Sequence, residues 1–290
     1  MKKGIRGLLL GAVCMLALAG CGNATESPVD KEEVSAETLV QEAQRILEET
    51  DSFAADFKAV VAMGDFGRTL TEGAVTMVKE PLYAKVDTVI AFSDQEQTYE
   101  LYLEKTEDAV NQYMNYDGQW TEMTLTEDSA LVGVRIYNTL YNMETIFSAV
   151  ESWTVEEDGA NMKLTGVIPE SKIYAVEEYT RWFQMAGMSG LSEVYFEGVG
   201  DVPVVMTLDG KTGAPVSYSV DLTKALETVT NNVLKELNGG VAGNSIEVTE
   251  YNITSTVTQL GDVEAEPIPD EAKSDAINYE KEISMLEDAE

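Results

Sequence analysis

The chain of 290 residues contains no histidine. Histidine is the commonest general base and a frequent metal ligand, so its absence excludes Ser-His-Asp and Cys-His catalytic sites and imidazole metal sites. Walker A, GxSxG and GxGxxG motifs are missing as well. Carboxylates are numerous, but in so acidic a chain their pairing does not indicate a glycosidase. The sequence therefore predicts a protein that is not an enzyme and has no catalytic residue, cofactor or metal site.

Positive charge is also scarce. The 19 Lys and Arg residues face 52 Asp and Glu residues, which gives a formal net charge of −33 at pH 7. Such a surface repels nucleic acid and anionic lipid headgroups, so neither is an electrostatic partner. Solubility at a crowded exterior surface accounts for the charge, and weak collection of Ca²⁺ or Mg²⁺ stays open as a second explanation. The segments EEDGAN and TLDGKTG lack the ligand series of an EF-hand loop.

Cysteine is nearly absent, and both copies, Cys14 and Cys21, lie in the first 21 residues. Three positive residues open the chain, and an apolar run follows over residues 8–19. This run is too short for a helix that spans a bilayer and has the length of the apolar part of a signal peptide. Within that segment, Cys14 is interpreted as a small apolar residue.

Residues 18–21, LAGC, resemble the bacterial lipobox. The resemblance implies a signal peptide over residues 1–20, cleavage before Cys21, and diacylglyceryl and palmitoyl groups on that cysteine. Two acyl chains give durable anchoring, because each buried methylene contributes about 0.8 kcal/mol. An ordinary secretory signal with a chance cysteine is the alternative. Loss of the three positive residues leaves 16 Lys and Arg against 52 acidic residues and a formal charge of −36.

A flexible linker and a helix are expected next. Residues 21–34 hold the lipidated cysteine and a polar stretch whose end-to-end distance is ~20 Å as a coil. Ser35 is a good N-cap for a helix that ends near Asp51. Apolar residues recur on one face of this helix, as in an amphipathic helix packed on a core. They are Leu39, Ala43, Ile46 and Leu47.

Segments rich in Val, Thr and Tyr then predict a run of strands. They cover residues 53–63, 68–79, 82–92, 97–106, 109–116 and 119–125. Asp117-Gly118 is a two-residue hairpin signal between the last two. Near the C-terminus, residues 245–259 predict a strand pair or one bulged strand.

The segment SWTVEEDGANMKL predicts another hairpin, with a two-residue loop at Asp158-Gly159. This loop would place apolar side chains on one face and polar side chains on the other, as in a half-buried antiparallel pair. The predicted opposite pairs are Val155 with Met162 and Trp153 with Leu164.

A third hairpin is predicted around LDGKTGA. Apolar residues alternate along both of its arms, as expected for strands with one buried face. They are Val204, Met206 and Leu208 on the first arm and Val216, Tyr218 and Val220 on the second.

Three helical stretches interrupt the strands. Residues 126–149 have a helical pattern with an expected break near Asn142. Residues 171–186, from Ser171 to a stop at Gly187, are apolar nearly all round, which predicts a deeply packed helix. The third starts near Asp221 and ends at Gly239-Gly240. Its apolar stripe is Leu222, Leu226, Val229, Val233 and Leu237.

Together these segments predict a mainly β, α+β fold, in which one large curved antiparallel sheet surrounds a few helices. We expect a single domain over residues 35–277 and an acidic tail over residues 278–290. The lipobox, the linker, the first helix, the long meander with inserted helices and the closing PIPDEA segment resemble the LolA/LolB-like lipoprotein-carrier superfamily. The resemblance is nearest to uncharacterised LolA-like lipoproteins of Gram-positive bacteria. It implies an open half-barrel with an apolar cavity that holds acyl chains or senses the state of the envelope.

A ligand-contacting loop is expected over residues 187–203, which include Gly187, Gly190, Gly198 and Gly200. Glycines make this stretch mobile, and large apolar groups on a mobile loop often contact a ligand. Closure of one end of the sheet over the core is the alternative role. Trp182, Phe183 and Met185, just before this loop, have the same two possible roles, with a stronger bias to the core. The candidate ligand-binding residues are Trp182, Phe183, Met185, Met188, Leu191, Tyr195 and Phe196.

Two functions follow from these observations. The first is a lipoprotein on the extracytoplasmic face of the cell membrane, anchored through Cys21, that binds an apolar ligand such as an acyl chain, lipid or lipopeptide. The second is an envelope sensor or interaction lipoprotein that meets another envelope protein and has no small-molecule ligand. A lipid carrier would retain its lipid during gentle purification. A protein whose acidic surface binds a basic partner protein would instead release that partner at high salt, because salt screens the exposed charges.

Replacement of Cys21 tests the anchor. Cys21→Ser should abolish thioether lipidation, because serine offers no thiolate to accept the lipid. Fractionation after metabolic labelling with a fatty-acid analogue measures this, with the wild-type chain as control. The folded domain should be unaffected, because no disulfide depends on Cys21. Label that persists in Cys21→Ser would overturn the lipoprotein assignment.

Overall fold

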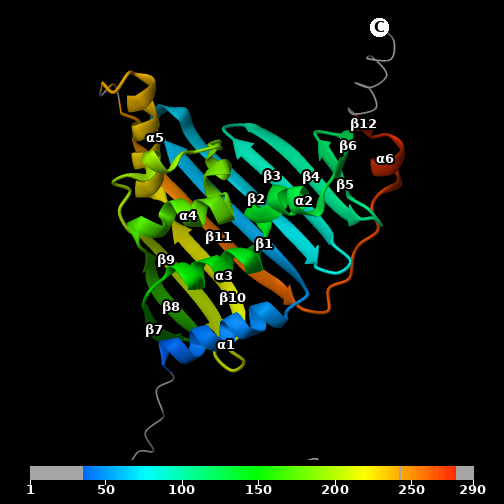
Figure 1. Ribbon diagram of the computed structural model, residues 1–290, viewed down its shortest axis with the longest axis horizontal. Helices are drawn as coiled ribbons and strands as arrows, with labels where there is room; N and C mark the ends of the chain where they lie inside the picture. The colour runs from blue at the N-terminus through cyan, green and yellow to red at the C-terminus, as the bar shows by residue number, and fades with distance from the viewer. Residues whose placement is uncertain (1–34, 242, 244, 279–290) are drawn as a thin grey trace, which may run out of the picture. The chain divides into compact units, whose positions relative to one another are not determined.

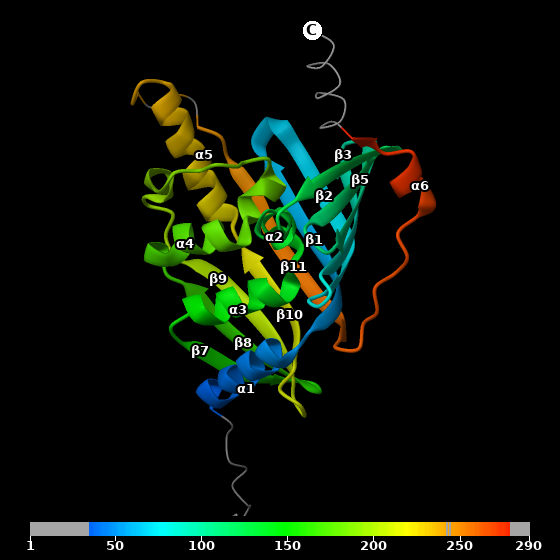
Figure 2. The same cartoon turned by 45° about the vertical axis from the view of Figure 1, so that its right-hand side comes forward.

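The computed structural model describes residues 35–241, 243 and 245–278, and the lipobox, Cys21 and the stretch 279–290 lie outside them. The strands of the described residues form one sheet in the order β12-β6-β5-β4-β3-β2-β1-β11-β10-β9-β8-β7. Neighbours are antiparallel, except that β12 runs parallel to β6. Because β12 and β7 lie at opposite edges, the sheet is open, and it curves around the helices (Figures 1 and 2).

The first half of the sheet is a meander whose strand bounds agree with the predicted segments to within two residues. Its turns include Asp117 and Gly118 with φ of 47° and 90°, the left-handed conformation that a two-residue hairpin requires. A short 3₁₀ turn, η1 (Gly64–Phe66), joins the first two strands. The strands are β1 (Ser52–Met63), β2 (Gly67–Val78), β3 (Tyr83–Phe92), β4 (Gln95–Lys105), β5 (Val110–Tyr116) and β6 (Gln119–Leu125).

The second half is a shorter meander that returns to the first. Its last strand pairs with β10 on one side and with β1 on the other, so it joins the two halves. Of the predicted alternatives for 245–259, a strand pair or one bulged strand, the second is confirmed, because the register between β1 and this strand shifts at Ala54/Ala55 and again at Ala62/Met63. The strands are β7 (Trp153–Asp158), β8 (Asn161–Ile168), β9 (Val202–Asp209), β10 (Pro215–Asp221) and β11 (Val248–Leu260).

The predicted register of the β7–β8 hairpin is wrong by two residues. Asp158 pairs with Asn161, so the loop residues are Gly159 and Ala160, and Gly159 takes the positive φ of 63°. Trp153 lies opposite Gly166, where a Cβ atom would come within 3.0 Å of the indole ring. The glycine thus makes room for tryptophan. A shift of two residues preserves the side-chain faces, so the predicted apolar face is retained.

The β9–β10 hairpin matches its prediction apart from a bulge. Tyr218 lies opposite Met206 and Val220 opposite Val204, and all four are buried. Pro215, rather than Val216, lies opposite Leu208, because the register shifts between Pro215 and Ser217.

The first helix, α1 (Ala36–Glu49), begins where it is predicted. The Ser35 hydroxyl accepts a hydrogen bond from the Thr38 amide at 3.2 Å, which satisfies one free donor of the first turn. Its buried side chains, Leu39, Ala43 and Leu47, recur every four residues and face the sheet and α3.

The connection from β6 to β7 holds two helices, α2 (Glu127–Val134) and α3 (Thr139–Ala149), with the 3₁₀ turn η2 (Arg135–Tyr137) between them. The predicted break near Asn142 is wrong, because the break lies at Asn138. Asn138 is the N-cap of α3, and its Oδ1 atom accepts from the Tyr141 amide at 3.1 Å. Asn142 is fully buried instead, and its Nδ2 atom donates to the Tyr218 hydroxyl at 3.3 Å.

The predicted helix over 171–186 is shorter than expected. α4 (Glu170–Thr180) ends at Arg181, which has a left-handed φ of 60°, and the 3₁₀ turn η3 (Trp182–Ala186) follows up to Gly187. The predicted stop of the helix at Gly187 is therefore wrong by six residues, and Gly187, with a left-handed φ of 76°, ends the 3₁₀ turn instead. A second 3₁₀ turn, η4 (Glu193–Phe196), precedes β9.

The last long helix, α5 (Thr223–Leu237), buries only its first half. Leu222, Leu226 and Val229 are buried, whereas Leu237 is 77% exposed at the far end. The closing segment then crosses the outer face of the sheet through α6 (Asp270–Ser274) to β12 (Ile277–Asn278). Asn278, the first residue of the predicted acidic tail, donates from Nδ2 to Glu122 at 3.2 Å.

Both faces of the sheet carry apolar side chains. Helices α2, α3 and α4 lie against the inner face (Figure 2), where the main core forms. On the outer face a second, smaller cluster packs under the closing segment. It consists of Tyr83, Tyr102, Tyr113, Trp120 and Ala272. The structure thus confirms the predicted fold class, a large open antiparallel sheet around a few helices.

A glycine in β2 leaves room for the sheet to pack against η2, in the connection from β6 to β7. A Cβ atom on Gly73 would lie 2.1 Å from the Asp87 carbonyl oxygen and 2.5 Å from Cζ of Phe57. The Phe57 ring uses this space and packs against Tyr137 of η2, with ring centroids 5.0 Å apart. Gly73 therefore fixes the distance between the sheet and η2.

Gly73→Ala should lower the free energy of unfolding by about 2 kcal/mol or more, because a backbone oxygen must move to admit the methyl group. Gly133→Ala in α2 is the matched control: its Cβ would lie 3.7 Å from Oε1 of Gln112, an ordinary van der Waals contact, so it should be neutral or stabilising by up to ~1 kcal/mol. Urea denaturation measures both. Equal stabilities for the two variants would contradict this account of Gly73.

Candidate ligand-binding site

The seven residues predicted to contact a ligand lie together beside α4 and α5. Trp182, Phe183 and Phe196 are buried, with exposed fractions of 1%, 1% and 4%. The Phe183 ring packs against Phe196, with ring centroids 5.4 Å apart, and against Tyr251 at 6.1 Å. These three side chains act as core packing in this structure.

The other four predicted residues, Met185, Met188, Leu191 and Tyr195, are half-buried against the same core. Tyr195 also lines a shallow hollow beside the last turns of α5. The structure thus brings the seven residues together and leaves four of them with exposed surface. Their contact with a ligand stays a prediction.

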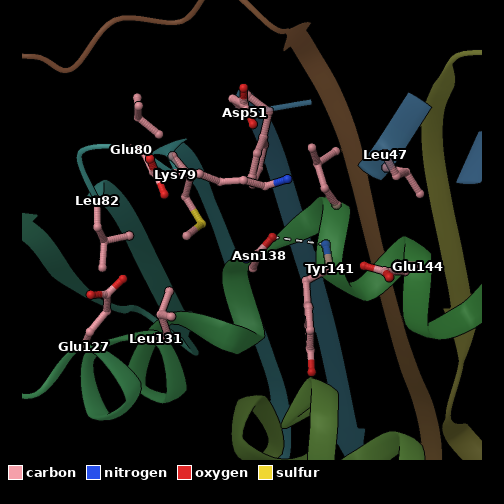
Figure 3. Close-up of a pocket in the computed structure, with 14 residues that line it drawn as sticks. Leu47, Asp51, Lys79, Glu80, Leu82, Glu127, Leu131, Asn138, Tyr141 and Glu144 are labelled. Carbon is pink, nitrogen blue, oxygen red and sulfur yellow. Dashed lines mark hydrogen bonds between the residues drawn. The ribbon is translucent and has the colours of Figure 1, made fainter. Parts of the chain in front are cut away.

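A pocket lies elsewhere on the inner face, between the end of α1, the β2–β3 turn and helices α2 and α3. We call it the α1–α3 pocket, and its volume is about 310 Å³. None of the seven predicted residues lines it. Figure 3 shows the side chains around it. The lining residues are Leu47, Asp51, Phe53, Met77, Val78, Lys79, Glu80, Leu82, Glu127, Leu131, Asn138, Leu140, Tyr141 and Glu144.

Half of the lining is apolar, and most of that half is buried. Leu47, Phe53, Met77, Leu82 and Leu140 are each no more than 5% exposed. Val78 and Leu131 are half-buried. Such a floor favours a hydrocarbon group, because transfer of apolar surface out of water contributes about 25 cal/mol per Å².

Local hydrogen bonds hold the elements around the pocket in place. The Lys79 amide donates to the Asp51 carbonyl at 2.8 Å, which ties the end of β2 to the junction of α1 and β1. Thr126 caps α2 by accepting from the Ser129 amide at 3.2 Å. Asn138 caps α3, as the dashed line in Figure 3 marks. The pocket therefore lies where the end of β2 and the capped starts of α2 and α3 meet.

The polar half of the lining holds one cation and four carboxylates. Glu127 is engaged with the Lys105 ammonium group. Across the described residues, neither Lys79 nor Asp51, Glu80 or Glu144 has an ion-pair partner within 4.0 Å. The mouth thus presents one free ammonium and three free carboxylates around an apolar floor.

Tyr141 forms one wall of the pocket. Its ring lies 6.0 Å from the Arg135 guanidinium and 6.4 Å from the Tyr179 ring. Burial raises the pKa of the Tyr141 hydroxyl, and the Arg135 charge opposes that rise. The hydroxyl therefore stays neutral near pH 7 and adds no charge to the mouth.

Sequence reasoning missed this pocket because its residues come from five separate segments. The helical pattern of 126–149 contained Leu131, Leu140 and Tyr141, but periodicity does not tell which of the apolar positions meet a void. Within the described part of the chain, no group of three or more Asp, Glu or Cys side chains could hold a metal ion. No described helix is both long and apolar enough to cross a bilayer.

Comparisons with known proteins give structural similarity alone. No family model and no curated protein matches the chain. Among solved structures, the chain is similar to lipoprotein LppX of Mycobacterium tuberculosis, at 14% identity over 80% of this chain and 100% of that one, with a TM-score of 0.41. It is similar to LprF of Mycobacterium bovis at 12% identity over 81% and 96%, with a TM-score of 0.40.

A LolA superfamily protein of Nitrosomonas europaea is similar at 9% identity over 82% of this chain and 96% of that one, with a TM-score of 0.24. At these identities and TM-scores the similarities decide neither the family nor the ligand of this chain. The function proposed below therefore rests on the strand order and on the α1–α3 pocket.

Glu177 is a buried carboxylate at the junction of α4 and η3, next to the seven predicted residues. It is 8% exposed, and its Oε2 atom accepts from the Phe183 amide at 3.1 Å. Burial raises the pKa of Glu177 to about 7, against the smaller opposing effects of that amide and of the Arg181 charge. The folded state therefore favours the protonated form more than the unfolded state does, where a Glu pKa is ~4.3.

This difference predicts a pH-dependent stability. The contribution of protonated Glu177 to the free energy of unfolding is fully present below about pH 4. It is lost as the pH rises through about 7, because this carboxyl group ionises at lower pH in the unfolded chain than in the folded one. Glu177→Gln keeps an acceptor for the Phe183 amide without the charge. Its stability relative to wild type should rise by about 3 kcal/mol between pH 4 and pH 8. Denaturation midpoints measured across that range check this, and parallel curves for the two proteins would contradict it.

Proposed function

We propose that the protein is a membrane-anchored, extracytoplasmic lipoprotein that binds an apolar ligand without catalysing a reaction. An acyl chain, a lipid or a lipopeptide fits this description. The observation that carries the proposal is the α1–α3 pocket, whose buried floor consists of leucine, methionine and phenylalanine side chains. The predicted lipid on Cys21 supplies the anchor.

The order of elements supports a relation to the LolA/LolB-like lipoprotein-carrier superfamily, and a nearest relation to its Gram-positive members is part of the proposal. A lipobox, a linker and an amphipathic helix precede an open antiparallel sheet with inserted helices, as the resemblance implies. The lining is a general apolar surface rather than a set of specific groups. Such a surface suits a carrier or sensor of acyl chains better than an enzyme.

The size of the pocket limits the ligand. Its volume of about 310 Å³ lies at the lower end of the range for small-molecule sites, ~300–1,000 Å³. Most of the inner face is filled by the helices and the core. We therefore infer a site for one chain, or for one end of a larger lipid, rather than a cavity for a whole multi-chain lipid.

Filling the pocket should remove the ligand. Leu131→Trp places an indole against the apolar floor, and we expect the amount of lipid that co-purifies from membranes to fall about tenfold or more, the ratio for ~1.4 kcal/mol of binding energy. Native mass spectrometry and lipid extraction of the gently purified protein measure this.

Val132→Trp is the matched control, because Val132 is the next residue of α2, is 39% exposed and does not line the pocket. It should retain lipid as the wild type does. Wild-type protein that carries no lipid would instead favour the second function, an envelope sensor or interaction lipoprotein without a small-molecule ligand. Equal retention by both variants would place the ligand outside the α1–α3 pocket.

A further inference from the structure

The charges at the mouth of the α1–α3 pocket are not balanced by one another. Figure 3 shows Lys79, Glu80, Glu127 and Glu144 around one opening, supplied by the β2–β3 turn, α2 and α3. Lys79 and Glu80 are exposed, as are Asp51 and Glu144. No ion pair joins Lys79 to any of these carboxylates among the described residues, although all line one pocket.

Such an arrangement discriminates between headgroups. A ligand that bears only a negative group is attracted by the Lys79 ammonium group but repelled by three unpaired carboxylates. A ligand that bears only a positive group is attracted by the carboxylates and repelled by Lys79. A zwitterion gains both attractions when its anionic group lies nearer Lys79 and its ammonium group lies nearer a carboxylate, and each close charge pair in water contributes ~1 kcal/mol.

We propose that the α1–α3 pocket selects a single-chain zwitterionic amphiphile, which places its chain on the apolar floor, its anionic group at Lys79 and its primary ammonium group beside one of the carboxylates Asp51, Glu80 and Glu144. This inference rests on the proposed function and adds to it the chemical class of the ligand. The apolar floor supplies most of the affinity, and the mouth supplies the choice between headgroups.

A single chain fits the geometry of the floor. The buried apolar residues come from α1, β1, β2, the β2–β3 turn and α3, around a volume of about 310 Å³. They are Leu47, Phe53, Met77, Leu82 and Leu140. The charged residues lie on the exposed side of the same lining. A chain on the floor therefore brings its headgroup to the mouth.

The experiment compares four probes that share a twelve-carbon chain and differ in their headgroups. The full chain, in detergent, is offered a mixture of lauroyl-lysophosphatidylethanolamine, Nα-lauroyl-lysine, lauroyl-lysophosphatidylglycerol and dodecylammonium, and native mass spectrometry reports the bound fraction of each. The first two are zwitterions from different sources, a lysophospholipid and an acylated amino acid. The third is anionic and the fourth cationic.

We expect at least one zwitterion to bind about fivefold to tenfold more tightly than the anionic and cationic probes. The better of the two zwitterions identifies the source of the ligand. Lys79→Met should remove the preference over dodecylammonium, and the double substitution Glu80→Gln with Glu144→Gln should remove the preference over lauroyl-lysophosphatidylglycerol. These residues are exposed, so the substitutions are compatible with the fold.

Two matched controls are exposed residues that do not line the pocket. Lys211→Met and Glu157→Gln replace exposed residues in the β9–β10 turn and in β7, and both should bind all probes as the wild type does. Equal binding of all four probes by the wild-type chain would overturn the inference and leave the proposed function standing. Binding of none of them, with folded protein, would overturn both.

Discussion

The structure depends on one topological constraint, the crossing of the chain from one edge of an open sheet to the other. The strand β6 lies next to one edge and β7 forms the opposite edge, so the connection between them must traverse the whole inner face. That face is apolar and must be covered, because exposed apolar surface costs about 25 cal/mol per Å². The connection covers it with α2, η2 and α3. Buried polar contacts fix its course, since Thr139 and Ser255 share a hydrogen bond of 2.7 Å and Asn142 donates to Tyr218.

The α1–α3 pocket is a consequence of that crossing. The connection turns between α2, which packs on β5, and α3, which packs on α4, and Asn138 is the N-cap at which α3 begins. Helix α1 reaches this corner only with its last turn, at Leu47. Three element ends therefore meet without filling the corner, and the apolar side chains beneath them line a hollow. Polar side chains are found at the same ends, because caps and first turns favour them. An apolar floor and a charged mouth thus arise from one packing geometry.

The strands and most helix starts could be predicted from local patterns, whereas the site could not. Richness in Val, Thr and Tyr located β1 to β6, alternation and Asp-Gly turns located β7 to β10, and Ser35 located the start of α1. Two errors have local causes. The β7–β8 loop is Gly159 and Ala160 rather than Asp158 and Gly159, and this register lets Trp153 lie over Gly166. The predicted helix over 171–186 ends early because Arg181 takes a left-handed conformation. The pocket joins residues from Leu47 to Glu144, and a void between distant segments leaves no periodic signal. The aromatic residues near 182–196 gave a stronger signal, and three of them are core.

The central claim is that an acyl chain occupies the α1–α3 pocket, and crystallography with a heavy-atom probe tests it most directly. Crystals of the protein with a lauroyl-lysophosphatidylethanolamine that carries bromine at the end of its chain would locate that atom by anomalous scattering. The account predicts a bromine peak among Leu47, Met77, Leu82 and Leu140, with the headgroup beside Lys79. A bromine peak beside Met188 and Tyr195 instead, or a pocket without bromine at saturating probe, would contradict it.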